Sequence, residues 1–255
     1  MNQLNNTLSV RSILILIIYL LATAPGAAEE NSGINQFIES NVLGIFYHEL
    51  GHAVIDIEML PVLGQEEDAA DVFSIFMIDA LFDDQSAESL AYDASFGFWA
   101  EAEDRQSYSE DIPWWDVHGP DEQRYFNTVC IFYGADPNNR QQFAEDLGLP
   151  EERAETCDIE YDQANASWGR VLGRLINRGP GQSLSFESQD DSLISRTLEL
   201  EIKQLNGEMQ LSHDVEVSVE SCDEANAYYD HEDRRIVFCT EFEAHLKNLA
   251  RLLQE

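Results

Sequence analysis

The run His48-Glu49-Leu50-Gly51-His52 constrains this chain more than any other part of its sequence. On a helix, residues i and i+4 lie about 40° apart around the axis, so both imidazoles can reach one metal ion. Glu49 lies one step round the helix, where its carboxylate can serve as a general base beside a metal-bound water. The pattern predicts a helix that holds zinc, and with it a metal-dependent hydrolase.

The residues around this motif predict a buried helix. Residues 42–58 are apolar apart from the motif and a short acidic end, Ser40 or Asn41 can cap the start, and Pro61 follows the segment. Two imidazoles and a carboxylate are costly to bury without partners, and one metal ion satisfies all three. The alternative is a core helix whose histidines bond to backbone carbonyls.

A third metal ligand is expected just downstream, because catalytic zinc sites usually have three protein ligands and one open position. A turn at Leu60–Gly64 would bring a second helix back against the first, with Glu67 facing the metal. Asp71, four residues later, would then face a ligand histidine and accept its distal N–H, while Glu66 and Asp68 face solvent. The alternative is an acidic first turn that is stabilised by the helix dipole.

These motifs resemble those of known families. The pattern HExxH followed by ExxxD resembles the gluzincin class of zinc metallopeptidases. The strings HELGHAVID, LPVLGQEEDAAD, HGPDEQRYFN and CIFYGADP resemble a bacterial metallopeptidase family of unknown function, over most of residues 36–178. The resemblance implies one zinc ion per chain with His48, His52 and Glu67 as ligands, Glu49 as the base, and Asp71 as the partner of a ligand histidine.

The N-terminus predicts export. Arg11 precedes an apolar run, Ile13–Ala22, that is short for a bilayer, and small residues ending in Gly26-Ala27-Ala28 follow. We interpret residues 1–28 as a cleaved signal peptide, which places the chain in the periplasm or outside the cell, without stable membrane insertion; an uncleaved anchor is the alternative. We expect residues 29–178 to form a helical metallopeptidase region, residues 179–192 a linker, and residues 193–255 a helix and hairpin that complete the same domain.

The four cysteines all lie after the predicted cleavage site, as is typical of an exported protein with paired thiols. Three pairings are possible. We favour Cys130 with Cys157 and Cys222 with Cys239, because each pair brackets a short segment. Free buried thiols are the alternative if the chain is not exported.

The charge is strongly negative: 14 basic residues face 49 acidic ones, for a formal net charge of -35. Nucleic acid is therefore excluded as an expected partner. The acidic residues are spread along the chain, which favours surface solvation in a saline environment over attraction of basic substrates.

His118 is the candidate for stabilising the oxyanion of a tetrahedral intermediate, because gluzincin sites commonly use a further His or Tyr for this purpose. It follows an aromatic connector and precedes an expected helix, residues 121–133, that would hold Arg124 and Tyr125 nearby. The alternative, that His118 caps this helix and never contacts substrate, is left open.

The last 63 residues, 193–255, include a strand pattern that the preceding helical region lacks. Val215, Val217 and Val219 alternate with other residues, and a predicted hairpin contains Asn226-Ala227-Tyr228-Tyr229. This stretch resembles the edge strand of thermolysin-like enzymes, where the Asn side chain and the backbone bind an extended peptide. In the related metallopeptidases a similar segment precedes the zinc helix, so the order here looks circularly permuted. Asn226 and Ala227 are the candidate substrate-binding residues, and the alternative is an appended hairpin without substrate contact.

Together these features predict a single α+β domain: a mainly helical, zincin-like fold with a small antiparallel sheet or hairpin. The predicted function is a zinc metallopeptidase that hydrolyses peptides or proteins, in which zinc lowers the pKa of water from about 15.7 towards about 7 and Glu49 accepts the proton. The alternatives are a zinc hydrolase of non-peptide amides and a non-catalytic secreted protein with structural zinc. The sequence does not indicate the oligomeric state.

Overall fold

The structure is a computed structural model that describes residues 25–254. Most of the predicted signal peptide, residues 1–28, therefore lies outside the described residues. The fold is mainly helical with one small sheet, as predicted. Its elements are α1 (Pro25–Ile57), α2 (Glu66–Leu81), α3 (Asp84–Ser107), α4 (Asp121–Ala135), α5 (Gln141–Asp146), α6 (Glu151–Ala154), α7 (Cys157–Ala164), the π-helical turn η1 (Asn165–Gly169), α8 (Arg170–Asn177), β1 (Leu184–Ser188), α9 (Leu193–Glu208), β2 (Val215–Glu220), β3 (Ala227–Asp230), β4 (Arg235–Cys239) and α10 (Glu241–Leu252).

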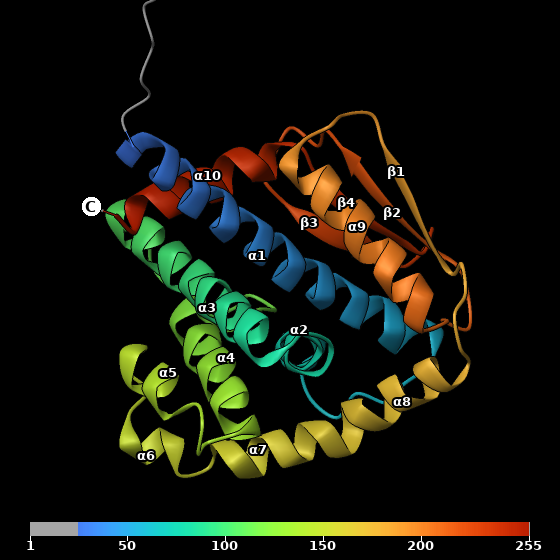
Figure 1. The fold of residues 1–255 in the computed structure, drawn as a ribbon, viewed down its shortest axis with the longest axis horizontal. Coiled ribbons are helices and arrows are strands. Elements are labelled where there is room, and N and C mark those ends of the chain that lie inside the picture. The colour runs from blue at the N-terminus through green and yellow to red at the C-terminus, as the bar shows by residue number, and fades with distance from the viewer. Residues whose placement is uncertain (1–24, 255) are drawn as a thin grey trace, which may run out of the picture.

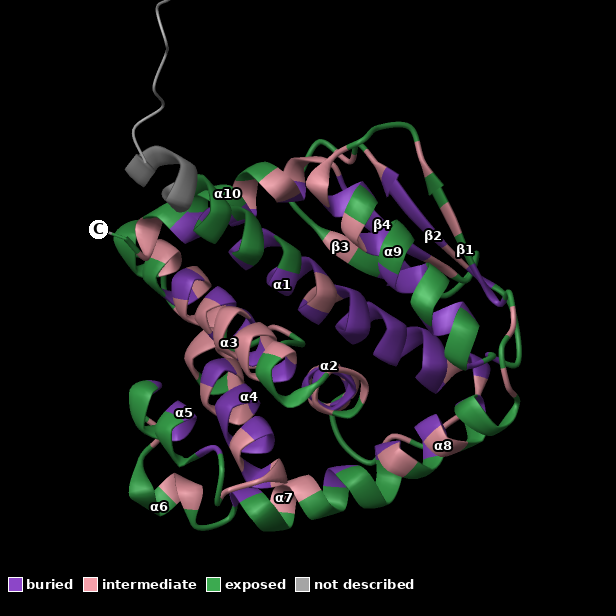
Figure 2. Cartoon of the chain, viewed as in Figure 1, coloured by how far each residue is buried: buried purple, intermediate pink, exposed green. Residues whose placement is uncertain are grey.

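Helix α1 runs through the middle of the molecule, between α2, α3 and α4 on one side and α9, α10 and the sheet on the other (Figure 1). Its residues from Val42 onward are nearly all buried, whereas the outer faces of α8 and α9 are exposed (Figure 2). The apolar sequence around the HELGH motif is therefore explained by contacts on all sides of this helix.

The expected start of this helix was wrong. Ser40 and Asn41 do not cap it but lie inside α1, where both are buried. The Ser40 hydroxyl donates to Asp93 Oδ2 at 2.8 Å, and the Asn41 amide donates to the backbone oxygens of Phe37 and Asp93. These polar side chains instead join α1 to α3, which a sequence pattern that favours caps does not reveal.

The sheet has the strand order β1-β2-β4-β3. Strands β1, β2 and β4 are parallel, and β3 pairs antiparallel with β4 through a register that joins Ala227 to Phe238. The predicted hairpin is thus present as β3 and β4, and Val215, Val217 and Val219 of β2 are buried as their alternation indicates. The sheet as a whole is mixed rather than antiparallel.

Strand β1 lies inside residues 179–192, which we interpreted as a linker. Its Gly, Ser and Gln neighbours made the segment look irregular, but Leu184 pairs with Val215 and is buried. The segment is therefore partly a strand of the sheet.

The two cysteine pairs that the spacing favoured are both formed. Cys130 of α4 is bonded to Cys157 at the start of α7, and Cys222 is bonded to Cys239 at the end of β4. Within residues 25–254, no helix combines the length and the apolarity that a bilayer crossing needs.

We expect the purified protein to contain both disulfides and no free thiol, because each bond joins elements that are packed together in the fold. Mass spectrometry after non-reducing digestion should find peptides that join Cys130 to Cys157 and Cys222 to Cys239. Reduction before alkylation is the control and should label all four cysteines. Four alkylated cysteines without reduction would contradict the prediction.

Candidate metal centre

Three side chains from two helices converge on one point. Nε2 of His48 lies 3.2 Å from Nε2 of His52, and each of these atoms lies 3.2 Å from Oε2 of Glu67. In a tetrahedral zinc site with bonds of about 2.0–2.1 Å, ligand atoms lie about 3.3–3.4 Å apart. The spacing and the donor types therefore fit zinc. Among the described residues, these three form the group that could hold a metal ion.

Gly51, inside the HELGH motif, allows this convergence. A side chain there would place its Cβ 3.1 Å from Phe73 and 3.2 Å from the Ala70 backbone, both on α2. Without that Cβ, α2 packs directly against α1, and its first turn brings Glu67 over the two histidines. The glycine therefore sets the distance between the two helices that supply the ligands.

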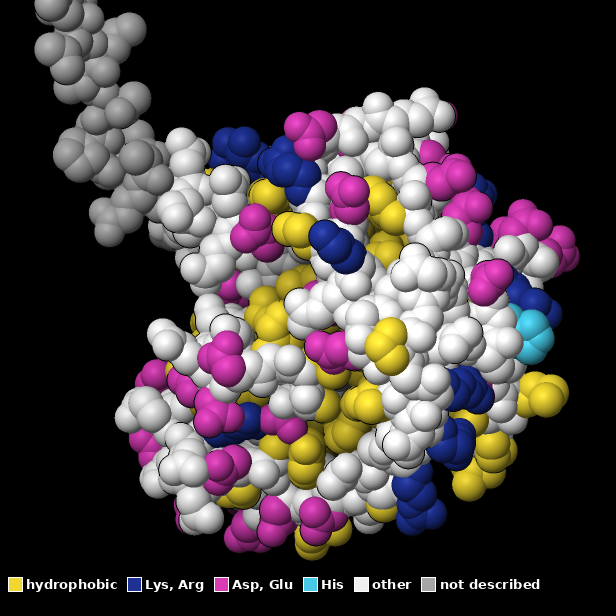
Figure 3. All heavy atoms as spheres, turned by 45° about the vertical axis from the view of Figure 1, so that its right-hand side comes forward, with side chains coloured by type: hydrophobic (Ala, Val, Ile, Leu, Met, Phe, Trp, Pro, Cys, Tyr) yellow, Lys and Arg dark blue, Asp and Glu magenta, His cyan; other side chains and the backbone are white. Residues whose placement is uncertain are grey.

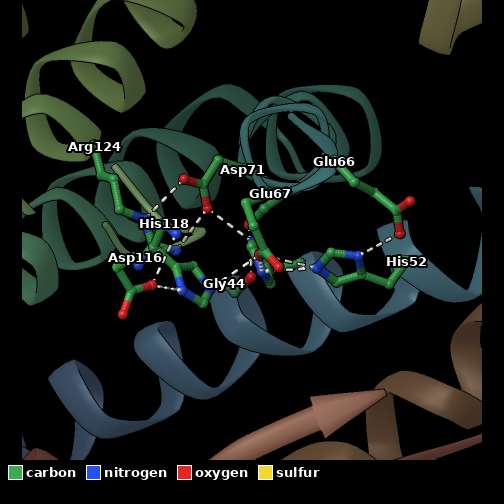
Figure 4. Close-up of polar contacts among 10 residues, drawn as sticks. Gly44, His52, Glu66, Glu67, Asp71, Asp116, His118 and Arg124 are labelled. Carbon is green, nitrogen blue, oxygen red and sulfur yellow. Dashed lines mark hydrogen bonds and ion pairs between the residues drawn. The ribbon is translucent and has the colours of Figure 1, made fainter. Parts of the chain in front are cut away.

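Each candidate ligand histidine has a carboxylate beside its Nδ1 atom. Figure 4 shows Glu66 in this position beside His52. Oδ1 of Asp71 lies 2.8 Å from Nδ1 of His48, as an ion pair rather than a well-aligned hydrogen bond. The structure thus places Asp71 beside a ligand histidine, as the spacing suggested. The expectation that Glu66 faces solvent was wrong: its Oε1 lies 2.9 Å from Nδ1 of His52. Such contacts fix the ring orientation of a ligand histidine and raise its basicity.

The electrostatics of the site favour a cation. Burial works against the charged form of His48, but Asp71 and Glu67 outweigh it and raise the pKa of His48 to about 9. The pKa of Glu67 is lowered, because its contacts with His118, His48 and His52 outweigh the cost of burial. Metal ligation needs neutral imidazoles, so zinc binding competes with protonation of these histidines.

Glu49 is placed differently from the ligands. Its side chain is buried, 7% exposed, and lines the same cavity as His48. Burial is the largest influence on the Glu49 carboxyl and raises its pKa. It is absent from the group of convergent donors among the described residues. Glu49 therefore shares a cavity with one candidate ligand, and its role as a general base stays a prediction.

His118 lies in the connection between α3 and α4 and does reach the centre. Its Nε2 lies 2.9 Å from Oε2 of Glu67, while Oδ1 of Asp116 lies 3.2 Å from its Nδ1. The cap of α4 is Pro120 instead, so the alternative in which His118 caps this helix is not observed. The nearby Arg124 also points into the site, but Tyr125 packs in the core and donates to the backbone of Leu147.

One cavity of about 440 Å³ joins these residues to the C-terminal segment. His48, Glu49 and His118 line it, and so do Asn226 and Ala227. Asn226 immediately precedes β3, which forms one edge of the sheet. The cavity therefore includes both predicted substrate-binding residues and one candidate ligand, His48, although they lie about 180 positions apart in the sequence.

Three contributors were missed or undervalued in the sequence: Glu66, Asp116 and Arg124. Glu66 directly precedes Glu67, and an acidic first turn disguises its contact with His52. Asp116 stands two residues before His118, a spacing typical of local side-chain to backbone bonds, and it accepts the backbone N–H of His118 at 3.0 Å. Arg124 has no local signal, because its partner Asp71 lies 53 residues away.

Comparison with known proteins identifies the family. The chain matches the DUF4344 family, described as "Putative metallopeptidase", over residues 19–172 and 185–254. It belongs to this family. No curated protein and no solved structure shows a significant match to the chain. The metallopeptidase family and the His48, His52 and Glu67 group together support a metal-dependent peptidase.

In this metallopeptidase, Glu67→Ala should abolish tight zinc binding, whereas Asp71→Ala and Glu66→Ala should weaken it by about 10 to 100-fold each. The reason is that Glu67 is a candidate ligand, whereas Asp71 and Glu66 contact only a histidine of the group. Zinc affinity is measured by competition with a chromogenic chelator. Asp68→Ala, an exposed neighbour on α2, is the control. Unchanged zinc affinity in Glu67→Ala would show that another residue is the third ligand.

Proposed function

We propose that this chain is a zinc-dependent peptidase in which Glu49 is the general base. The observation that carries the proposal is the spacing of the donor atoms of His48, His52 and Glu67, which fits a tetrahedral zinc site. One of these residues, His48, lines a cavity that Glu49 also lines. Three ligands leave a fourth position for water or substrate, whereas a structural zinc site is usually closed by four protein ligands. A zinc ion in this position would polarise the substrate carbonyl and lower the pKa of a bound water.

The protein's own side chains would then manage the protons and the developing charge. Glu49, held rigidly on α1, accepts the proton from the attacking water and passes it to the leaving amine. His118, held by Asp116, would turn its Nε2–H from Glu67 to the oxyanion that forms at the substrate carbonyl and donate a hydrogen bond to it. Asp71 and Glu66 keep the imidazoles of His48 and His52 in their ligand orientation.

The free edge of β3 is the proposed binding site for the substrate backbone. An extended peptide can add to an exposed strand edge through its own N–H and C=O groups. Ala225, Asn226 and Ala227 line the cavity at the start of this edge, so a peptide bound there would pass Glu49 and His48. This geometry favours a peptide over a small non-peptide amide, which needs no strand edge.

The proposed location is the periplasm or the extracellular space. The two disulfides are consistent with an oxidising compartment. Acidic side chains are scattered among basic and apolar ones on the face that Figure 3 presents. A dispersed negative surface fits solvation in a saline medium better than one concentrated site for a basic partner.

The proposal is tested by digesting a peptide library with the purified chain after chelation and after addition of zinc. Zinc-loaded protein should cleave peptides at defined bonds, and chelated protein should not. A matched panel of non-peptide amides distinguishes the alternative substrate class. Zinc binding without hydrolysis of either class would contradict an enzymatic role.

Asn226→Ala should lower kcat/KM for peptides about tenfold without changing the zinc content, because Asn226 contacts substrate rather than metal in this proposal. Glu232→Ala is the control, since it removes an exposed acidic side chain from the turn after β3 and does not line the cavity. Both kinetics and zinc content are measured on each variant. Full activity in Asn226→Ala would show that Asn226 does not bind substrate.

A further inference from the structure

The connection between α3 and α4 carries an unusual apolar surface. We define residues 108–119 as the Trp loop. Tyr108 is 72% exposed, Trp114 78%, Trp115 85% and Val117 61%. Single exposed apolar side chains are ordinary, but large aromatic groups clustered in one short loop indicate an interaction surface.

The Trp loop is anchored in the candidate metal centre by the residue that follows these aromatic groups. The His118 ring contacts Glu67 and Asp116, and the His118 backbone N–H donates to the same Asp116 carboxylate (Figure 4). Trp115 and His118 are only three residues apart in the chain. The exposed indoles therefore lie near the site where a substrate would react.

A second hollow, of about 210 Å³, lies beside the Trp loop. Ile112, Pro113 and Asp116 of the loop line it. His118, Asp121 and Arg124 line both this hollow and the main cavity. A bound chain can therefore continue from the metal centre past His118 and along the Trp loop.

We infer that the Trp loop is a second binding surface for polypeptide substrate, which takes apolar side chains several residues away from the scissile bond. This inference rests on the proposed peptidase function. The shared wall of the two hollows indicates substrate as the occupant. The net charge of -35, with Glu110, Asp111 and Asp116 in the loop itself, opposes both an anionic membrane and a second copy of this chain.

The test uses zinc-loaded Glu49→Gln, so that bound peptide is not cleaved. The probes are two blocked dodecapeptides without Trp: one has Phe and Leu alternating with Ser and Gly, and in the other Ser replaces every Phe and Leu. Calorimetry measures affinity, and tryptophan emission reports whether the exposed indoles become covered. The apolar peptide should shift the emission to shorter wavelength and bind more tightly than the Ser peptide.

Adding Trp114→Ala and Trp115→Ala should weaken the apolar peptide about tenfold, abolish most of the emission shift and leave the Ser peptide unchanged. The matched control adds Ile159→Ala and Leu200→Ala, which also remove exposed apolar side chains, 55% and 70% exposed, from α7 and α9. This control should bind both peptides like the parent.

Equal affinity of the two double variants for the apolar peptide would overturn the inference while leaving the peptidase proposal intact. An emission shift on addition of phosphatidylcholine vesicles alone would also overturn the inference. A dimer that dissociates in the tryptophan variant would overturn it as well. If the zinc-loaded protein binds neither peptide and the wild type cleaves no library peptide, the proposed function and this inference fail together.

Discussion

Glu49→Gln is expected to retain one zinc ion per chain and to lose peptide hydrolysis by about 10² to 10⁴-fold, the usual contribution of a positioned general base. Gln has nearly the same shape as Glu but cannot accept the proton. Glu49 lies outside the group of convergent metal donors among residues 25–254, so its amide should not disturb the metal.

His48→Ala is the comparison variant for Glu49→Gln. This variant removes a ligand, so it should lose zinc as well as activity. Zinc content by elemental analysis and kcat/KM on one peptide from the library are measured for both variants. Retained activity in Glu49→Gln would refute the mechanism, and zinc loss in that variant would instead make Glu49 a ligand.

The ligand helix and the convergence of its partners could be predicted because they depend on short-range geometry. The i, i+4 spacing makes His48 and His52 point the same way, and the turn before Glu67 brings the next helix back against the first. The short loops likewise favoured the two disulfides. These features need no knowledge of how distant elements pack.

The remaining features depend on long-range contacts that a local pattern does not encode. Strand β1 is recognisable only from its pairing with β2, and Arg124 only from its contact with Asp71. Ser40 and Asn41 looked like caps because the apolar run begins after them, yet their bonds to α3 keep them inside a longer helix. In each case tertiary packing overrides the local preference.

The circular permutation stays a prediction. Asn226 and Ala227 of the C-terminal segment line the same cavity as His48 and Glu49. Direct packing of α1 against β3 supports the same interpretation, since Tyr229 donates to Asp56 at 2.9 Å. The family match is divided into two parts, and the break at residues 173–184 lies next to β1. A direct test is to move the C-terminal segment in front of α1 and measure peptide hydrolysis.

Arg124→Met is expected to lower the free energy of unfolding substantially and to weaken zinc binding at the same time. The Arg124 guanidinium donates two hydrogen bonds of 2.8 Å to Asp71 and lies 4.3 Å from the centre of the Phe98 ring. The side chains of Arg124 and Asp71 are only 14% and 12% exposed. Removing one partner of a buried ion pair costs about 3–5 kcal/mol. We expect a cost at the lower end of this range, because His48 still faces the Asp71 carboxylate.

The pH dependence follows from Asp71. Burial acts to raise its pKa, but Arg124 and His48 outweigh burial and hold the pKa below the usual value of 3.8. A carboxyl whose pKa is lower in the folded chain than in the unfolded chain stabilises the fold above the unfolded value. This contribution is lost as the pH falls through the folded value. The stability difference between wild type and Arg124→Met should therefore be full near neutral pH and decline below about pH 4.

The double variant Arg124→Met with Asp71→Asn separates the two effects. It leaves no unpaired buried charge, so it should recover much of the stability that Arg124→Met loses. It should not recover zinc affinity, because His48 then lacks the carboxylate beside Nδ1. Urea unfolding of the chelated proteins measures the first quantity, and chelator competition measures the second. If the double variant regained both, Asp71 would serve the fold and not the metal centre.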